Sequence, residues 1–335
     1  MRHPSILVTL AIAMIARIPA LSQEGNNPFA GRWDMTVSTA KGAYPAWMEV
    51  VEKDGNLQVR IQGRVSSVRP AAAAKMAGSR LMVTLSGAFP ARPASGKKAA
   101  AAARPEVTWE LTVEGGQLTG SQKQGDAVDA QLAGVRAPAL KHVAPGAWTD
   151  PERLFNGKDL TGWVTVNNTQ HPTATTNRWV VEDGELVNDT PGHNLVTTRK
   201  FNDFKLHAEF NLTAAGNSGI YLRGRYEVQV QSAAGGPSAR GGGLTDVGSV
   251  YGLIAPSVDI PAKPDQWQIF DITLIGRDVT IDLNGVRIID NQRIPGITGG
   301  ALDSNEGEPG PIYLQGEHSG GIRFRNITIS VPKKG

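Results

Sequence analysis

The sequence predicts an all-β protein with two parts, an N-terminal antiparallel β-barrel and a C-terminal jelly-roll β-sandwich. Three observations support this prediction. Apolar and polar residues alternate along many short segments, as in strands whose successive side chains point to opposite faces. Gly (39 residues) and Pro (21 residues) are frequent, which provides turns. Clear amphipathic helices are missing from the C-terminal half.

The barrel is predicted to span residues 28–135. Its clearest alternating runs are residues 57–62 and 107–113, and glycine-containing turns suited to hairpins flank both. About eight candidate strands fit an up-and-down barrel. The Gly-Arg-Trp tripeptide at residues 31–33 resembles the opening of a lipocalin-like barrel. This part therefore either holds a small ligand or is a filled structural module.

The first 22 residues have the pattern of a signal peptide. Arg2 and His3 precede an apolar run at residues 5–18, and small residues then offer a cleavage site before Gln23. The run is shorter than the roughly 20 residues of a comfortable membrane span. We therefore expect an exported protein, periplasmic or secreted, with no membrane span after cleavage. An uncleaved anchor is the alternative.

The composition of the chain excludes several kinds of site and partner. The chain has no cysteine, which excludes disulfides and thiolate metal sites. The formal net charge is only +3, and no dense Lys/Arg stripe with interleaved aromatics is present, so a nucleic-acid partner is not expected.

Residues 136–150 show little periodicity and are predicted to link the barrel to the jelly roll of residues 151–332. The sequence predicts no oligomeric state.

The outward faces of the predicted C-terminal strands are rich in hydrogen-bonding groups. Three consecutive strands carry His207 and Glu209, then Tyr221 and Arg223, then Glu227 and Gln229. If these strands are neighbours, Glu209, Arg223, Glu227 and Gln229 converge on one patch. Carboxylates, amides and arginine suit the hydroxyl groups of a polyhydroxylated ligand. The alternative is an ordinary solvated face with surface ion pairs.

Two further features are candidates for function. His318 follows Gln315 and Glu317 near a strand end, and it is either a general base or a loop histidine. Trp267 either stacks on a sugar ring or packs in the core. No sequence motif for nucleotide, phosphate or zinc is present.

The C-terminal half resembles the 3-keto-disaccharide hydrolase domain family. The resembling segments run in family order: 154–163 (LFNGKDLTGW), 179–186 (WVVEDGEL), 203–209 (DFKLHAE), 216–223 (GNSGIYLR), 226–230 (YEVQV), 310–315 (GPIYLQ) and 324–327 (FRNI). One departure follows the sixth segment. The family often has Gln-Asp/Gly-His-Gly there, whereas this chain has Gln-Gly-Glu-His at 315–318, which places the role of His318 in doubt.

The resemblance implies a concanavalin A-like jelly roll that acts on glycosides oxidised at C3. A base would remove the C2 proton, the leaving group at C1 would depart by elimination, and water would add, giving net hydrolysis. The implied catalytic residues are Glu227 (the first choice of base), Glu209, His207, His318 and Arg223. The implied substrate-binding residues are Gln229, Tyr221, Asn217, Gln315, Trp267 and Arg325.

A divalent metal held by His207 and carboxylates would also fit this chemistry, although no spacing requires a cofactor. Two other functions use the same fold and the same polar patch. One is a non-catalytic carbohydrate-binding module of the cell envelope, and the other is a structural or adhesion protein that uses both β-rich parts as spacers.

Overall fold

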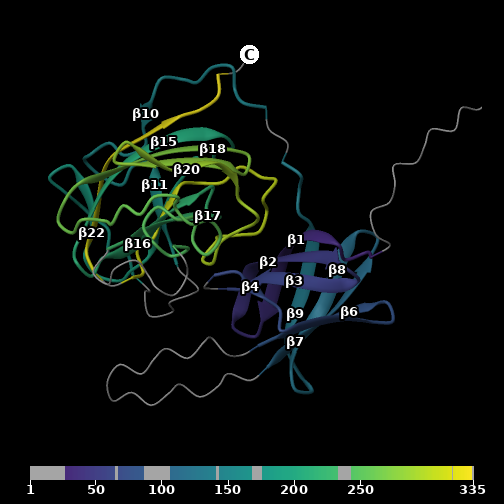
Figure 1. The fold of residues 1–335 in the computed structure, drawn as a ribbon. Helices are drawn as coiled ribbons and strands as arrows, with labels where there is room; N and C mark the ends of the chain where they lie inside the picture. Colours follow the sequence, from purple (N-terminus) through teal and green to yellow (C-terminus); the bar gives the residue numbers. More distant parts are fainter. Residues whose placement is uncertain are drawn as a thin grey trace, which may run out of the picture.

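The computed structural model describes residues 27–64, 67–86, 106–140, 143–167, 176–232, 243–318 and 320–333. Within these ranges the chain forms twenty-two strands and no helix, so the predicted all-β class is confirmed (Figure 1). None of the described elements is a helix long and apolar enough to cross a membrane. The predicted signal peptide lies outside the described residues.

The N-terminal part is one antiparallel sheet with the strand order β4-β3-β2-β1-β9-β8-β7-β6-β5. Its strands are β1 (Gly31–Thr39), β2 (Gly42–Lys53), β3 (Asn56–Gln62), β4 (Arg69–Pro70), β5 (Ala73–Ala77), β6 (Arg80–Leu85), β7 (Val107–Glu114), β8 (Gln117–Gln124) and β9 (Ala127–Arg136).

This sheet curls on itself. The segment 69–77 pairs with β3 at its start and with β6 at its end. Between the two pairings, Ala71 N–H donates to Val59 O and Ala72 N–H donates to Thr84 O, both at 2.8 Å. The alternate residues facing inward form a core that includes Trp33. The N-terminal part is thus a curled antiparallel sheet. That it forms a lipocalin-like barrel stays a prediction.

The C-terminal part contains two further sheets. One has the order β12-β13-β22-β15-β18-β19-β20, with β10 also paired to β22, and the other has the order β11-β14-β21-β16-β17. The strands are β10 (Glu152–Arg153), β11 (Trp163–Val166), β12 (Val180–Glu182), β13 (Glu185–Asn188), β14 (Asn194–Thr197), β15 (Phe204–Leu212), β16 (Asn217–Leu222), β17 (Tyr226–Gln231), β18 (Gln268–Ile275), β19 (Asp278–Leu283), β20 (Val286–Arg293), β21 (Tyr313–Leu314) and β22 (Ile322–Ser330).

The two C-terminal sheets share one hydrophobic core. Every second residue of β15 is buried, as strict alternation predicts for a strand with one face on a core. Phe210 of β15 stacks on Phe270 of β18 with ring centroids 4.8 Å apart, and Ile220 and Val228 reach the same core from the five-stranded sheet. The prediction that this half is a β-sandwich, with two sheets packed on one core, is therefore confirmed.

The expected convergence of one polar patch is wrong. β15, which carries His207 and Glu209, pairs with β18 and β22 in the eight-stranded sheet. β16 and β17 pair with each other in the five-stranded sheet. The chain changes sheets after β15, so Glu209 does not share a sheet with Glu227. Alternation shows which residues share a face of a strand, but it does not show to which sheet that strand belongs.

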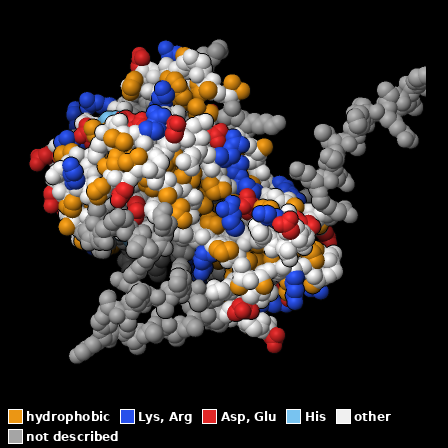
Figure 2. Space-filling view, in the orientation of Figure 1, with side chains coloured by type: hydrophobic (Ala, Val, Ile, Leu, Met, Phe, Trp, Pro, Cys, Tyr) orange, Lys and Arg blue, Asp and Glu red, His pale blue; other side chains and the backbone are white. Residues whose placement is uncertain are grey.

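The two β-rich parts meet at a defined contact. Trp47 of β2 is fully buried and belongs to the C-terminal core rather than to the core of its own sheet. Beside it, Arg32 pairs with Glu306 at 2.7 Å, and the Glu306 side chain has no exposed surface. Lys and Arg side chains gather along the border of the two parts (Figure 2).

Candidate active site

The polar side chains of the five-stranded sheet share its outer face. Residues such as Ile220, Val228 and Leu314 point into the sandwich core. Their strand neighbours therefore point the other way. The residues on this outer face are Asn217, Gly219, Tyr221, Glu227, Gln229, Gln231, Tyr313 and Gln315.

One row of this face runs across three paired strands. Tyr313 lies opposite Tyr221, and Tyr221 lies opposite Glu227. The two tyrosine rings stack with centroids 4.2 Å apart and planes 10° apart. Segment 248–251 extends the row beyond β17, because Tyr251 N–H donates to Glu227 O at 2.9 Å. Backbone pairing thus places Glu227 between the positions of Tyr221 and Tyr251.

Glu227 is a buried carboxyl group, with only 4% of its surface exposed. Burial raises its pKa from 4.5 to about 8, because the charged form loses its hydration. The charge of Glu317 contributes to this rise, and the neighbouring Tyr221 hydroxyl group opposes it. A carboxyl group with a pKa near neutrality can exchange a proton at physiological pH, which is what general acid–base catalysis requires.

A chain of hydrogen bonds borders this carboxyl group. The side-chain amide of Gln315 donates to Glu317 Oε1 at 3.0 Å and to the Tyr221 hydroxyl at 3.4 Å. The Tyr221 hydroxyl in turn donates to Gly299 O at 2.9 Å. Burial raises the pKa of Tyr221 and of Tyr313 well above 10, so both hydroxyl groups keep their protons. The Tyr221 proton is used by Gly299 O, so Tyr313 is the tyrosine on this face whose hydroxyl proton has no acceptor among the described residues.

Several buried acceptor oxygens on this face lack a donor among the described residues. They are Gln229 Oε1, Gln315 Oε1 and Asn217 Oδ1. Buried polar atoms without partners are costly, and they mark positions where a ligand can complete the hydrogen bonds. Sugar hydroxyl groups are donors, so three such acceptors on one face fit a polyhydroxylated ligand. Gln231 is exposed, so solvent reaches the face from the end of β17.

Main-chain carbonyl groups of other loops hold the Arg223 side chain. Its guanidinium group donates to Glu306 O, to Glu308 O at 2.7 Å and to Gly276 O at 3.4 Å. The side chain is 2% exposed, and its backbone has a φ of 55° in the turn between β16 and β17. These contacts join the turn between β16 and β17 to the loops that carry Gly276 and Glu306. Arg223 therefore positions the turn that leads into Glu227.

His207, Glu209, Trp267 and Arg325 form a separate group on the eight-stranded sheet. His207 Nδ1 lies 2.7 Å from Asp271 Oδ1. Burial raises the pKa of Glu209, but hydrogen bonds from Asn326 (2.8 Å) and Arg325 (2.6 Å) outweigh it and hold the pKa below its usual value. The Arg325 guanidinium stacks 3.9 Å from the Trp267 ring centroid. Glu209 is therefore a weaker base than Glu227.

His318 is half-buried in the loop after β21, directly beyond Glu317. No three His, Cys, Asp or Glu side chains in the described ranges gather closely enough to hold a metal ion. The described geometry thus gives no support to a metal held by His207 and carboxylates.

Sequence reasoning missed two aromatic residues of this face. Tyr313 stands two positions before Gln315, so period-two alternation already placed both on one side of the same strand. Tyr251 carried no comparable signal, because it reaches the sheet from a turn through isolated bridges rather than a named strand.

Known proteins are similar to the C-terminal half of this chain. Residues 150–330 match the profile of the 3-keto-alpha-glucoside-1,2-lyase-like domain. A 3-keto-disaccharide hydrolase from Bacteroides thetaiotaomicron is 27% identical over 122 residues, which cover 31% of this chain and 41% of that protein. The aligned segment thus spans less than half of that relative.

Solved structures are similar over the same half. A crystal structure of a glycosyl hydrolase candidate from Parabacteroides distasonis has 30% identity and a TM-score of 0.45, covering 56% of this chain and 92% of the other. A carbohydrate-binding module from Bacillus subtilis has 15% identity and a TM-score of 0.35, covering 50% and 94%. Because the matched profile covers more than half of the chain, the protein belongs to the 3-keto-alpha-glucoside-1,2-lyase-like domain family.

Proposed function

We propose that this protein cleaves 3-keto-glycosides on the outer face of the five-stranded sheet, with Glu227 as the base. The observation that carries the proposal is the buried Glu227 carboxyl group, whose pKa is raised to about 8, on a face with acceptor oxygens that lack donors. Membership of the family directs the proposal to keto-sugars.

The reaction needs one base and one acid. The ketone at C3 acidifies the C2 hydrogen, because loss of that proton gives an enolate. The Glu227 carboxylate takes the proton, and the electron pair of the C2–H bond enters the enolate. Collapse of the enolate forms a C1–C2 double bond and breaks the bond from C1 to the leaving oxygen, which takes the proton from the Glu227 carboxyl group and departs as an alcohol. Water then adds across the double bond, giving net hydrolysis.

The neighbouring side chains supply the remaining groups. Tyr313 keeps its proton, and its hydroxyl group makes no hydrogen bond among the described residues, so it can donate to the enolate oxygen. Tyr313 lies two strands from Glu227, a span of about 10 Å that a sugar ring over Tyr221 bridges. Gln229, Gln315 and Asn217 accept hydrogen bonds from the sugar hydroxyl groups.

The deciding experiment follows release of a chromogenic alcohol from a 3-keto-glucoside and from the matching unoxidised glucoside. We expect release from the keto-sugar alone, and a loss of about 1000-fold or more in Glu227→Gln, since general bases contribute up to about 10⁴-fold. A parallel measurement with a chelator tests whether the reaction requires a divalent metal, which the sequence alone did not decide. Sugar binding without release from either compound would instead indicate a carbohydrate-binding module.

We also propose that the protein is exported and that residues 28–135 form a lipocalin-like domain of their own. The basic start, the apolar run and the small residues before Gln23 motivate the first part. Mass spectrometry of the mature protein should give an N-terminus near Gln23, and an intact Met1 in an exported pool would contradict it. The curled nine-stranded sheet motivates the second part.

A further inference from the structure

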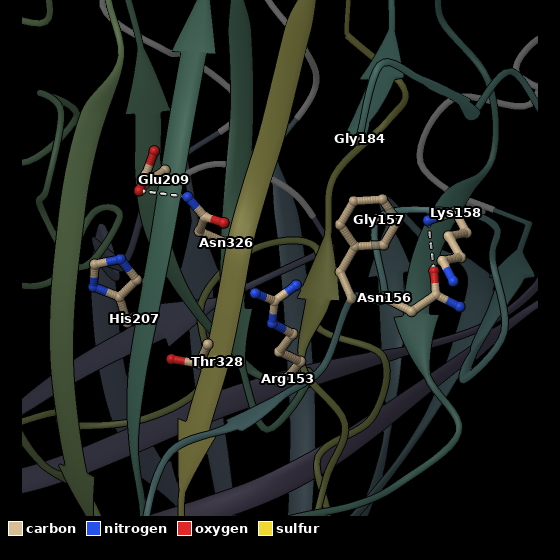
Figure 3. Close-up of a pocket in the computed structure, with 10 residues that line it drawn as sticks. Arg153, Asn156, Gly157, Lys158, Gly184, His207, Glu209, Asn326 and Thr328 are labelled. Atoms are coloured by element: carbon tan, nitrogen blue, oxygen red, sulfur yellow. Dashed lines mark hydrogen bonds between the residues drawn. The ribbon is translucent and has the colours of Figure 1, made fainter.

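A cavity of about 500 Å³ opens on the outer face of the eight-stranded sheet, away from Glu227 (Figure 3). Its floor consists of side chains from β15 and β22, including His207, Glu209 and Asn326. Its other side consists of Arg153 of β10 and the loop that follows it to Lys158. A volume of this size holds a small ligand such as a mono- or disaccharide.

Two glycines leave this cavity open. Gly157 and Gly184 both have positive φ angles, 75° and 82°, at the turns of the two loops that bound it. A Cβ on Gly157 would lie 3.9 Å from the Cα of Gly184, so the loops approach each other at the backbone. A Cβ on Gly184 would meet no atom within 4 Å. Neither position therefore places a side chain at this edge of the cavity.

The carboxylates around the cavity already have partners. Glu209 accepts hydrogen bonds from Arg325 and Asn326, and Glu185 pairs with Arg323 at 3.1 Å. Asp271 lies 2.7 Å from His207. The negative charge of this face is therefore largely compensated by neighbouring side chains.

Arg153 and Lys158 are the two cations that line the cavity, and the charge of Lys158 acts on the neighbouring carboxylate of Asp159. Neither Arg153 nor Lys158 forms an ion pair within the described residues, although both line the cavity. The side-chain oxygen of Asn156 is used within its own loop, where it accepts from the main-chain N–H groups of Lys158 and Asp159. In Figure 3, Arg153 stands between the β22 side chains and this loop. Among the lining residues, two cations thus stand opposite His207, Asn326 and one carboxylate, Glu209, which already accepts hydrogen bonds from Arg325 and Asn326.

We propose that this cavity is a second saccharide site, selective for a sugar that carries a carboxylate group. The Arg153 guanidinium matches a carboxylate with two parallel hydrogen bonds, and Lys158 adds a second charge. His207, Glu209 and Asn326 face the sugar hydroxyl groups from the opposite side. The cavity lies on a different sheet from Glu227. A uronic-acid residue of a glycan can therefore bind in the cavity while another part of the same glycan, or another substrate molecule, reacts at Glu227.

The test measures binding of methyl glucuronide to the full chain by ligand-observed NMR, with methyl glucoside and acetate as comparison ligands. We expect glucuronide to bind at least about tenfold more tightly than either, because charge-assisted bonds to the carboxylate and contacts to the sugar act together. Arg153→Gln with Lys158→Gln should weaken glucuronide binding by about tenfold or more. The matched control, Lys53→Gln with Lys75→Gln, removes the same charge from exposed positions of the N-terminal sheet.

The Glu227→Gln variant separates this proposal from the catalytic one. Glucuronide binding that survives in Glu227→Gln supports the second site whether or not the protein cleaves keto-glycosides. Loss of binding in that variant would place the ligand on the other sheet and overturn the proposal. Equal affinity for glucuronide and glucoside, or an equal loss in the control variant, would overturn it as well.

Discussion

Gly219 leaves the room that the carboxyl group of Glu227 occupies. The two residues lie on paired strands of the five-stranded sheet, and a Cβ added to Gly219 would stand 2.5 Å from Glu227 Oε1 and 2.9 Å from its Cγ. Real Cβ atoms do not approach other atoms so closely, so any side chain at position 219 must displace the carboxyl group. The position of the proposed base thus depends on a glycine that itself carries no functional group.

Gly219→Ala should therefore lower kcat/KM for a 3-keto-glucoside by about 100-fold, since a displacement of about 1 Å in a catalytic group has effects of that size. The clash is with a side chain rather than the main chain, so we expect the variant to fold. Gly146→Ala is the control, because a Cβ there meets nothing within 4 Å. Steady-state kinetics together with thermal melting checks both points, and wild-type kinetics in Gly219→Ala would contradict the role of Glu227.

The pH dependence of activity follows from the pKa of Glu227. A base must be ionised, and burial raises the pKa of Glu227 to about 8. We therefore expect kcat/KM to rise about tenfold per pH unit below that value and to level off above it. Rates measured from pH 5 to pH 10 on a substrate with a good leaving group check this. A plateau that begins near pH 5 would mean that a carboxyl group with an ordinary pKa acts as the base.

The sequence predicted the strands more successfully than their pairing. Alternation placed Tyr221, Glu227 and Gln229 on the polar sides of their strands, and the structure keeps them on one face. It could not show that Glu209 lies in the other sheet, because the chain changes sheets between β15 and β16. Nor could it show that Glu227 is buried, since burial depends on segments far along the chain, such as the one that carries Tyr251.

The contact between the two β-rich parts should make stability depend on pH. Burial, together with the charge of Glu306, raises the pKa of Asp34 from 3.8 to about 9. Between these values the folded protein holds a proton that the unfolded chain has lost, so stability decreases as the pH rises. Asp34→Asn stays neutral at every pH. Its stability should therefore exceed that of the wild type at pH 8, and this advantage should shrink toward pH 4.

Thermal melting of both proteins at several pH values measures this difference. An advantage of about 1 kcal/mol corresponds to a rise in Tm of about 2–4 °C for a domain of 150–250 residues. Asp126→Asn, an exposed turn position, provides the control for the loss of one carboxylate. An Asp34→Asn advantage of the same size at pH 4 and pH 8 would show that packing, rather than protonation, causes it.

Trp47 provides a test of how the two parts depend on each other. Its ring is fully buried against the C-terminal core, where a Cβ on Gly296 would lie 2.4–2.5 Å from the indole atoms. It points away from the interior of its own sheet, because its neighbours Ala46 and Met48 fill that interior. Trp47→Ala should therefore destabilise the full chain by about 3–5 kcal/mol, the usual cost of removing a buried tryptophan.

In the fragment of residues 28–135, however, the same ring has no C-terminal core to cover it. If that fragment folds by itself, as we propose, Trp47→Ala should change its unfolding free energy by less than about 1 kcal/mol, as exposed substitutions usually do. Denaturant unfolding of the two proteins and their variants gives both values. A large loss in the fragment would mean that Trp47 supports its own sheet, whereas a fragment that does not fold would show that the N-terminal sheet requires the C-terminal sandwich.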